Sequence, residues 1–138
     1  MKSVCVIGSG ISGSTIANLL SKKYKVDVYE KAKGIGGRSS HRRYLNKLGF
    51  DHGLQYISPK TSKFKKFCSG LQKKRVLKKW QGPHKFDHSK VLENKKHTKL
   101  IGAKGNNAIS KYLLKNINCI FGYELFKIER IKKNWKLS

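Results

Sequence analysis

Acidic side chains are scarce in this sequence: seven Asp and Glu residues stand against 32 Lys and Arg residues, for a formal net charge of +25 at pH 7. Such an excess can indicate nucleic acid or an anionic membrane surface as partner, because clustered cations neutralise phosphates. The lysines are instead scattered from Lys2 to Lys136. Only five of the basic residues are arginine, whose planar guanidinium group makes bidentate hydrogen bonds to phosphates and bases. A basic nucleic-acid-binding protein therefore stays an alternative function, and we expect nonspecific binding to polyanions.

Cysteines and long apolar runs are also few. Cys5, Cys68 and Cys119 form no C-x-x-C pair, so the usual zinc and dithiol motifs are excluded and we expect three free thiols in a reducing compartment. No stretch reaches the roughly 20 apolar residues of a membrane helix, and the run before Gly8 is too short for a signal-peptide core. The sequence predicts a cytoplasmic protein with no membrane span.

The first thirty residues have the pattern of a βαβ unit. Residues 3–7 form an apolar run that ends at a glycine, which is typical of a parallel strand covered on both faces. Residues 11–21 place apolar side chains at helical spacing, and residues 25–30 alternate as a second strand. We therefore predict a strand, a glycine turn, a helix and a second, parallel strand.

The rest of the chain predicts short elements in one domain of residues 1–138, without repeats or linkers. Helices are expected over 61–71 and 106–115. Strands are expected over 43–45, 49–51, 76–80, 85–87, 91–93, 99–101, 119–121, 124–131 and 134–137. The predicted fold class is α/β, a Rossmann-like βαβ dinucleotide-binding fold with added short antiparallel strands.

The segment Gly8-Ser9-Gly10-Ile11-Ser12-Gly13 lies where the first strand meets the helix. Gly8 permits the tight turn, Gly10 lets the backbone approach a pyrophosphate, and Gly13 lets the helix pack close to the strand. The N–H groups of the helix, which begins near Ile11 and Ser12, would face the phosphates. This motif predicts binding of the ADP part of a dinucleotide.

Glu30 ends the second predicted strand, 22 residues after Gly8. An acid at this place accepts hydrogen bonds from the adenosine ribose hydroxyls, and it disfavours a 2′-phosphate. NADP is therefore the dinucleotide that fits least, while FAD and NAD both satisfy the pattern.

No metal site is predicted. His84 and His88 are four residues apart and His97 follows, but no Cys, Asp or Glu completes the set at ligand spacing. We interpret these histidines as surface residues. No pattern of nucleophile and base identifies a catalytic residue either.

The stretch KAKGIGGRSSHRRYLNKLGFDHGLQYIS, after Glu30, resembles the second signature of flavin-dependent amine oxidases and, more closely, bacterial renalase-like FAD-dependent oxidoreductases. The matching positions are Gly36, Gly37, Arg38, Arg42, Arg43, Asp51, Gly53, Gln55 and Tyr56. The resemblance continues through Trp80-Gln81-Gly82-Pro83, LIGAKGNNAISKYLL and YELFKIERIKKNWKL. It covers nearly the whole chain but only the N-terminal part of a typical family member.

The resemblance implies FAD as the cofactor, with NAD as the alternative. It implies that Arg38 neutralises the pyrophosphate, that the backbone at Gly36 and Gly37 approaches the cofactor, and that the backbone of Leu125 contacts adenine. Gly53, Leu54 and Gln55 would lie near the flavin ring, and Lys31 joins Glu30 in the expected cofactor-binding set. Leu54 replaces the family's usual alanine, and Ile57 replaces an aromatic residue, so we expect crowding at the ring.

The function implied is that of the FAD-binding part of an oxidoreductase in which the flavin accepts a hydride. The chain is expected to be an incomplete FAD/NAD(P)-binding domain, truncated relative to the family and without a substrate domain. Alone it would be inactive, and a second polypeptide would supply what is missing. A non-catalytic dinucleotide-binding module and half of a split enzyme are the alternatives.

Overall fold

The computed structural model describes residues 2–45, 48–81, 85–87, 90–91 and 98–138. Strand β1 (Ser3–Ile7), helix α1 (Ile11–Leu20) and strand β2 (Lys25–Glu30) form a βαβ unit. Strand β9 (Asn118–Phe121) adds to β2, and all three strands run parallel in the order β1-β2-β9. The predicted α/β, Rossmann-like fold class is confirmed.

The elements between β2 and β9 are short. They are the 3-10 turn η1 (Gly37–Ser39), β3 (His41–Tyr44), β4 (Leu48–Asp51), α2 (Ser62–Lys73), β5 (Leu77–Lys79), β6 (Lys85–Asp87), β7 (Lys90–Val91), β8 (Leu100–Gly102) and α3 (Ala108–Leu113). The chain ends with β10 (Ile128–Ile131) and β11 (Asn134–Leu137). Four antiparallel pairs, β3-β4, β5-β8, β6-β7 and β10-β11, are the added short strands that the sequence predicts.

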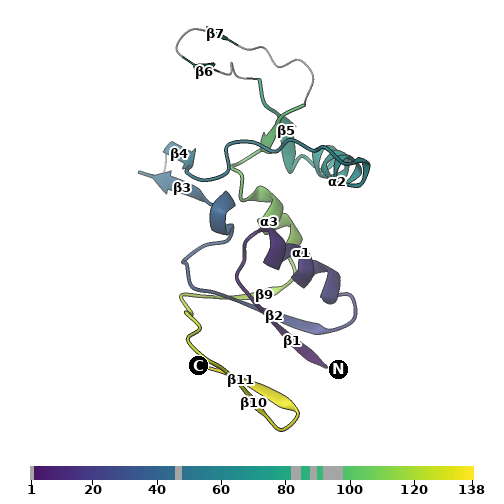
Figure 1. Cartoon of the computed structure of the whole chain (residues 1–138), viewed down its shortest axis with the longest axis vertical. Helices are drawn as coiled ribbons and strands as arrows, with labels where there is room; N and C mark the ends of the chain where they lie inside the picture. The colour runs from purple at the N-terminus through teal and green to yellow at the C-terminus, as the bar shows by residue number, and fades with distance from the viewer. Residues whose placement is uncertain (1, 46–47, 82–84, 88–89, 92–97) are drawn as a thin grey trace.

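The hydrophobic core has two parts. One lies between the parallel sheet and the helices α1 and α3, and contains Val6, Ala17, Val26, Val28 and Leu114. The other joins α2, β5, β8 and α3, and contains Ile57, Cys68, Leu71, Leu77, Leu100, Ile109 and Leu113. Figure 1 shows the sheet with α1 and α3 on one side and the β10-β11 hairpin on the other.

The sequence predicts that β1 is covered on both faces, and the structure contradicts this prediction. Exposure alternates along the strand, so that Val6 is buried while Cys5 and Ile7 are exposed. The helices α1 and α3 pack on one face only, and the opposite face looks toward the β10-β11 hairpin (Figure 1). A five-residue apolar run does not distinguish these two arrangements.

Several other element boundaries differ from the prediction by one to four residues, and two of them have a clear structural basis or position. The strand expected over 124–131 begins only at Ile128, because the segment before it bonds elsewhere: Tyr123 N–H donates to the Glu30 carbonyl (3.1 Å) and Gly122 N–H to the Ala32 carbonyl (3.3 Å). Helix α3 begins at Ala108 rather than 106. The expected strand over 91–93 lies partly outside the described residues.

Helices in the described part of the chain are too short and too polar to cross a membrane; α2, of 12 residues, is the longest of them. Cys5, Cys68 and Cys119 are free thiols.

Candidate dinucleotide-binding cleft

The glycine turn joins β1 to α1. Gly8 has φ +91°, a conformation that side chains rarely adopt, and its N–H donates to the Tyr29 carbonyl of β2 (2.8 Å). Gly10 is the N-cap residue, and its carbonyl accepts from Ser14 N–H (2.8 Å). The chain therefore reverses within three residues, and α1 begins at once beside the carboxyl end of β1.

Close packing of α1 on the turn requires glycine at position 13. A Cβ built on Gly13 would overlap the carbonyl oxygen of Gly8. One turn further along, Ala17 is fully buried against the sheet. The spacing of the first and third glycines is thus explained by contact between the helix and the turn.

A second glycine segment faces the first. Gly36 N–H donates to the Ser9 carbonyl (3.2 Å), and Gly10 and Gly36 form an isolated parallel bridge. Gly36 has φ +136°, and a side chain there would collide with Asn107 and Ser40. The hydroxyl of Ser39 donates to the Gly36 carbonyl (2.8 Å) and closes η1.

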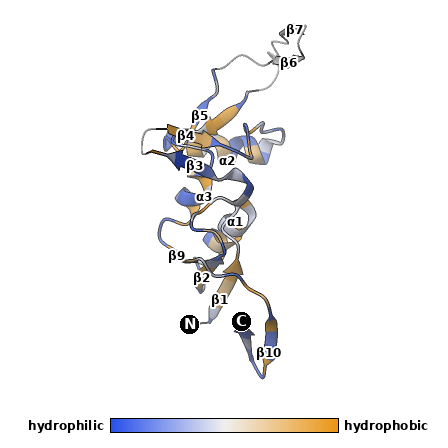
Figure 2. Ribbon diagram, turned by 90° about the vertical axis from the view of Figure 1, so that its left-hand side faces the viewer, coloured by the Kyte–Doolittle hydropathy of each residue, from blue (hydrophilic) through white to orange (hydrophobic). Residues whose placement is uncertain are grey.

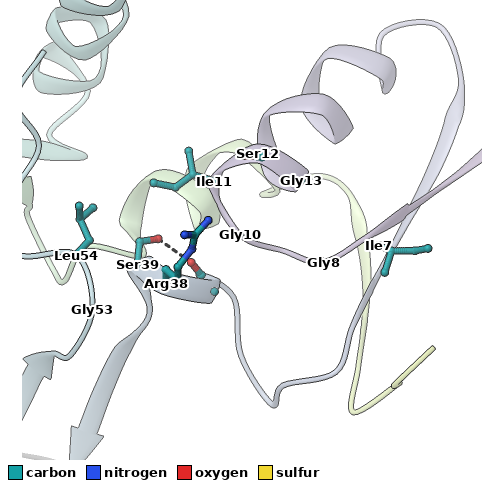
Figure 3. A pocket seen from close by; sticks show the side chains of 12 residues that line it. Ile7, Gly8, Gly10, Ile11, Ser12, Gly13, Arg38, Ser39, Gly53 and Leu54 are labelled. Atoms are coloured by element: carbon teal, nitrogen blue, oxygen red, sulfur yellow. Dashed lines mark hydrogen bonds between the residues drawn. The ribbon is translucent and has the colours of Figure 1, made fainter. Parts of the chain in front are cut away.

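These two segments border a cleft of about 830 Å³. Its lining residues are Ile7, Gly8, Gly10, Ile11, Ser12, Gly13, Gly36, Gly37, Arg38, Ser39, Gly53 and Leu54. Figure 3 shows the Arg38 side chain extending from η1 toward Gly10 and the start of α1. The cleft therefore combines glycine backbone, the N-terminus of a helix and one guanidinium group.

Gly10 faces open space in this cleft. A Cβ built on it would have no neighbour closer than 4.0 Å, at Gly36 O and Gly37 Cα. The unpaired N–H groups and positive dipole end of α1 lie beside this space, and no acidic side chain occupies the first helical turn. Glycine backbone at such a helix terminus can hold phosphate groups.

Glu30 lies beneath the turn instead of lining the cleft, and it is 7% exposed. One carboxylate oxygen accepts from both the N–H and the hydroxyl of Ser9 (2.7 Å each), and the other accepts from Ala32 N–H (2.9 Å). Burial alone would raise the pKa of Glu30, but these three hydrogen bonds and the charge of Lys31 lower it below its ordinary value. The group is thus an anion held against the glycine turn.

The segment 53–55 is positioned from two sides. Leu54 N–H donates to the Arg38 carbonyl (2.9 Å), and a Cβ on Gly53 would overlap that same carbonyl. Asn106 is fully buried, and its amide donates to the carbonyls of Leu54 (2.5 Å) and Gln55 (3.3 Å). Gly53 and Leu54 line the cleft, while Gln55 does not.

Lys31 and Leu125 lie outside the cleft lining. The Lys31 ammonium pairs with Glu124 at 3.6 Å on the exposed surface. Leu125 is half-buried and follows Tyr123, whose N–H bonds the Glu30 carbonyl and whose ring packs against Tyr29 at 5.0 Å. Both residues are therefore near the end of β2, and their roles stay predictions.

Three residues of this arrangement were missed from the sequence: Ser9, Ser39 and Asn106. Ser9 occupies a variable position of the glycine motif, so no pattern marks it as the partner of Glu30. Asn106 N–H donates to the Asp51 carboxylate (2.8 Å), and the Asn106 side-chain oxygen accepts from Gly102 N–H (2.9 Å). The resemblance includes Asp51 and the segment around Asn106, but it does not pair them.

No cluster of three metal-ligating side chains occurs within the described residues. His84, His88 and His97 lie outside them.

Residues 6–71 match the sequence model of the NAD(P)-binding Rossmann-like domain family. That span begins within β1 and contains α1, β2 and all the residues that line the cleft. The fold of this chain is therefore Rossmann-like and of the dinucleotide-binding class.

Two solved structures share the fold. The tetracycline destructase Tet(51) is 16% identical with a TM-score of 0.61, and THI4 of Thermovibrio ammonificans is 13% identical with a TM-score of 0.51. Each alignment covers 99% of this chain, but only 34% and 45% of those proteins, respectively. The chain thus spans less than half the length of either, and at these identities the likeness concerns the fold alone.

Proposed function

We propose that the cleft binds FAD, with NAD as the alternative dinucleotide. The observation that carries this proposal is the meeting of two glycine segments, tied by the bond between Gly36 N–H and the Ser9 carbonyl, around the N-terminus of α1. The pyrophosphate would lie against Gly10 and the first N–H groups of the helix, with Arg38 opposite.

Glu30 would hold the adenosine ribose. Its two oxygens accept three hydrogen bonds from the protein, and a carboxylate has about four acceptor positions, so one hydroxyl can still be accepted. A phosphate on the 2′ oxygen would meet this anion and be repelled. We therefore expect FAD and NAD to bind more tightly than NADP.

The preference for FAD over NAD depends on the residues after Glu30. Gly36, Gly37 and Arg38 add a second phosphate-facing turn, and Gly53 and Leu54 extend the cleft beyond it. The resemblance to renalase-like and amine-oxidase-like oxidoreductases implies that Arg38 neutralises the pyrophosphate of FAD, that the backbone at Gly36 and Gly37 approaches the cofactor, and that Gly53 and Leu54 lie near the flavin ring. A bound flavin supplies hydride acceptance, while the protein binds and orients it.

The chain would bind FAD weakly and catalyse no amine or NAD(P)H oxidation alone. Beyond the pyrophosphate, Gly53 and Leu54 are the residues of the expected ring site that line the cleft, so one face of the ring would meet water. Catalysis needs a dry site that positions the donor. We propose that a second polypeptide supplies it.

Titration with FAD, NAD and NADP tests the proposal. Binding is measured by flavin absorbance and by intrinsic protein fluorescence. The expected order is FAD, NAD, then NADP, with no turnover of amines or reduced nicotinamides. NADP as the tightest ligand would contradict the role of Glu30. Robust oxidation by the purified chain would contradict the need for a partner.

Binding to nucleic acid is the second candidate, favoured by the net charge of +25. We expect this binding to fall steeply with salt and to show no sequence preference, because lysines contribute counterion release without base readout. Electrophoretic mobility shifts with several oligonucleotides measure both properties. Tight binding of one sequence at about 0.2 M salt would promote this alternative.

A further inference from the structure

A second cavity, of about 580 Å³, lies beside the loop that follows β2. Its walls come from three stretches that are separate in the sequence: the loop 32–35, the β3-β4 hairpin with its flanking residues, and helix α3. It shares no lining residue with the dinucleotide-binding cleft. The fold therefore brings these stretches together around a space that the proposed function does not use.

Four cationic side chains line this cavity: Lys33, Arg42, Arg43 and Lys111. The dinucleotide-binding cleft and the cavity of about 750 Å³ between β1 and the β10-β11 hairpin are both larger, yet each is lined by a single Lys or Arg. The cations are thus concentrated here beyond what the net charge of the chain imposes on its other cavities. We call the space between these four side chains the cationic cavity.

No acidic side chain lines the cationic cavity, and none of its four cations forms an ion pair within the described part of the chain. Asp51 is bound by other groups: its Oδ1 lies 3.1 Å from His41 Nδ1 and accepts from Asn106 N–H (2.8 Å). Partial desolvation, and then the charge of Arg43, lower the pKa of Lys111. A bound anion would relieve the repulsion between these positive charges.

Direct contacts join the walls of the cationic cavity. Asn107, at the start of α3, is buried, and its amide donates to the Ile35 carbonyl of the loop (3.3 Å). A Cβ built on Gly105 would collide with the His41 ring, so β3 packs closely against the turn before α3. The cations therefore extend from walls that the fold holds together, which lowers the cost of ordering them around a ligand.

The residue types favour phosphate as the anion. Two of the five arginines of the chain, Arg42 and Arg43, are adjacent in β3, and Figure 2 shows this strand in the blue of hydrophilic residues. A guanidinium group binds phosphate oxygens in pairs, while lysine acts as a point charge. The volume exceeds that of a single phosphate and lies within the range of about 300–1,000 Å³ that small-molecule sites occupy. A concave site of this size suits a small ligand, whereas a nucleic-acid backbone follows an extended groove.

We propose that the cationic cavity binds a small molecule that carries two phosphate groups, and that this site is separate from the dinucleotide-binding cleft. Arg42 and Arg43 would bind the phosphate oxygens, and Lys33 and Lys111 would neutralise the charge from the loop and from α3. The inference holds whichever dinucleotide the cleft binds.

Calorimetric titration with inorganic pyrophosphate tests the site. The double variant Arg43→Gln/Lys111→Gln should bind pyrophosphate about tenfold or more weakly, because each substitution removes a charge-assisted hydrogen bond. The matched control Lys22→Gln/Lys23→Gln removes the same charge from exposed residues that line none of the three cavities, and it should stay within about twofold of the wild type. Equal losses in the two variants would show a response to net charge and would overturn the proposal.

Two further titrations separate this site from the cleft. Gly10→Val, in which the cleft is filled, should still bind pyrophosphate, and the Arg43→Gln/Lys111→Gln protein should bind FAD as tightly as the lysine control. Loss of pyrophosphate binding in Gly10→Val, or loss of FAD binding in Arg43→Gln/Lys111→Gln, would assign the anion to the dinucleotide site and overturn the proposal.

Other probes define the ligand. Inorganic phosphate should bind about tenfold or more weakly than pyrophosphate, since it engages fewer of the cations; equal affinity would indicate a site for one phosphate group and contradict the proposal. An oligothymidylate of about ten nucleotides should lose affinity equally in both double variants, because its binding depends on counterion release. A loss confined to Arg43→Gln/Lys111→Gln would make nucleic acid the occupant instead.

Acetylation of lysines in the wild type keeps the test decisive if the double variant fails to fold. Saturating pyrophosphate should slow acetylation of the exposed Lys33 and Lys111 several-fold and leave Lys22 and Lys23 unchanged, as measured by mass spectrometry of peptides. Unchanged acetylation of Lys33 and Lys111, or equal slowing at all four lysines, would overturn the proposal.

Discussion

The two faces of the sheet β1-β2-β9 differ in what covers them. On one face, Val6, Val26 and Val28 are at most 7% exposed beneath α1 and α3. On the other face, Ile7 is 51% exposed and Cys5 is exposed above the cavity shared with the hairpin. Among the described residues, the stability of the βαβ unit therefore depends mainly on the face that α1 and α3 cover.

The cleft depends on the covered face although it lies at the end of the sheet. Gly13 fixes the distance between α1 and the turn, and Ala17 continues the same contact into the core. Substitutions on the covered face should therefore change both folding and ligand binding, whereas a substitution at Cys5, on the open face and outside the cleft lining, should change neither.

The largest effect is expected from Gly13→Val, which would force α1 away from the Gly8 carbonyl. Overpacking of this kind costs about 3 kcal/mol or more when backbone must move, so both the folded state and the cleft should be lost. Urea unfolding and FAD titration measure the two losses. Gly34→Val is the control, because a Cβ on Gly34 meets nothing within 4 Å; similar behaviour of the two variants would contradict the packing role of Gly13.

A pair of truncations compares the faces directly. Val28→Ala removes two carbons from a fully buried side chain and should cost about 2 kcal/mol. Cys5→Ala, on the open face, should stay within about 0.5 kcal/mol of wild type. Urea midpoints of both variants give the difference, and equal costs would show that the open face is covered in solution.

Glu30→Gln should alter the pH dependence of stability. The folded-state pKa of Glu30 lies below its ordinary value, so its contribution is fully present above the unfolded-state pKa and is lost as pH falls through the folded-state pKa. Replacing the anion should cost about 1 kcal/mol at neutral pH and less in acid. Urea unfolding at pH 7 and at a series of lower pH values tests this; a cost of the substitution that does not shrink toward acid would exclude the charge as the cause.

The smallest effect concerns the reactivity of Cys5. Partial desolvation of the Cys5 thiol by its neighbours, and then the nearby charge of Asp27, raise its pKa although the residue is exposed. Asp27→Asn should therefore increase the thiolate fraction and speed alkylation roughly twofold near pH 8. Cys119, whose pKa burial alone raises, is the reference within the same protein. A rise at both thiols would indicate local opening of the sheet instead.

The local sequence pattern was sufficient to predict the βαβ unit. The bounds of β1 and β2 agree with the periodicity, and the glycine spacing is explained by the contact between Gly13 and Gly8. The covering of β1 was not predictable, since Cys5 and Ile7 are apolar whether they are covered or exposed. The Ser9–Glu30 bonds and the placement of residues 53–55 by Asn106 are tertiary contacts without a sequence signal.

The central claim, a pyrophosphate against Gly10, is tested most directly by FAD titration of Gly10→Val beside Gly34→Val. A Cβ at position 10 would project into the cleft with no neighbour closer than 4.0 Å, so the account predicts wild-type unfolding for both variants and loss of FAD binding in Gly10→Val alone. FAD affinity of Gly10→Val equal to that of Gly34→Val and the wild type would contradict it.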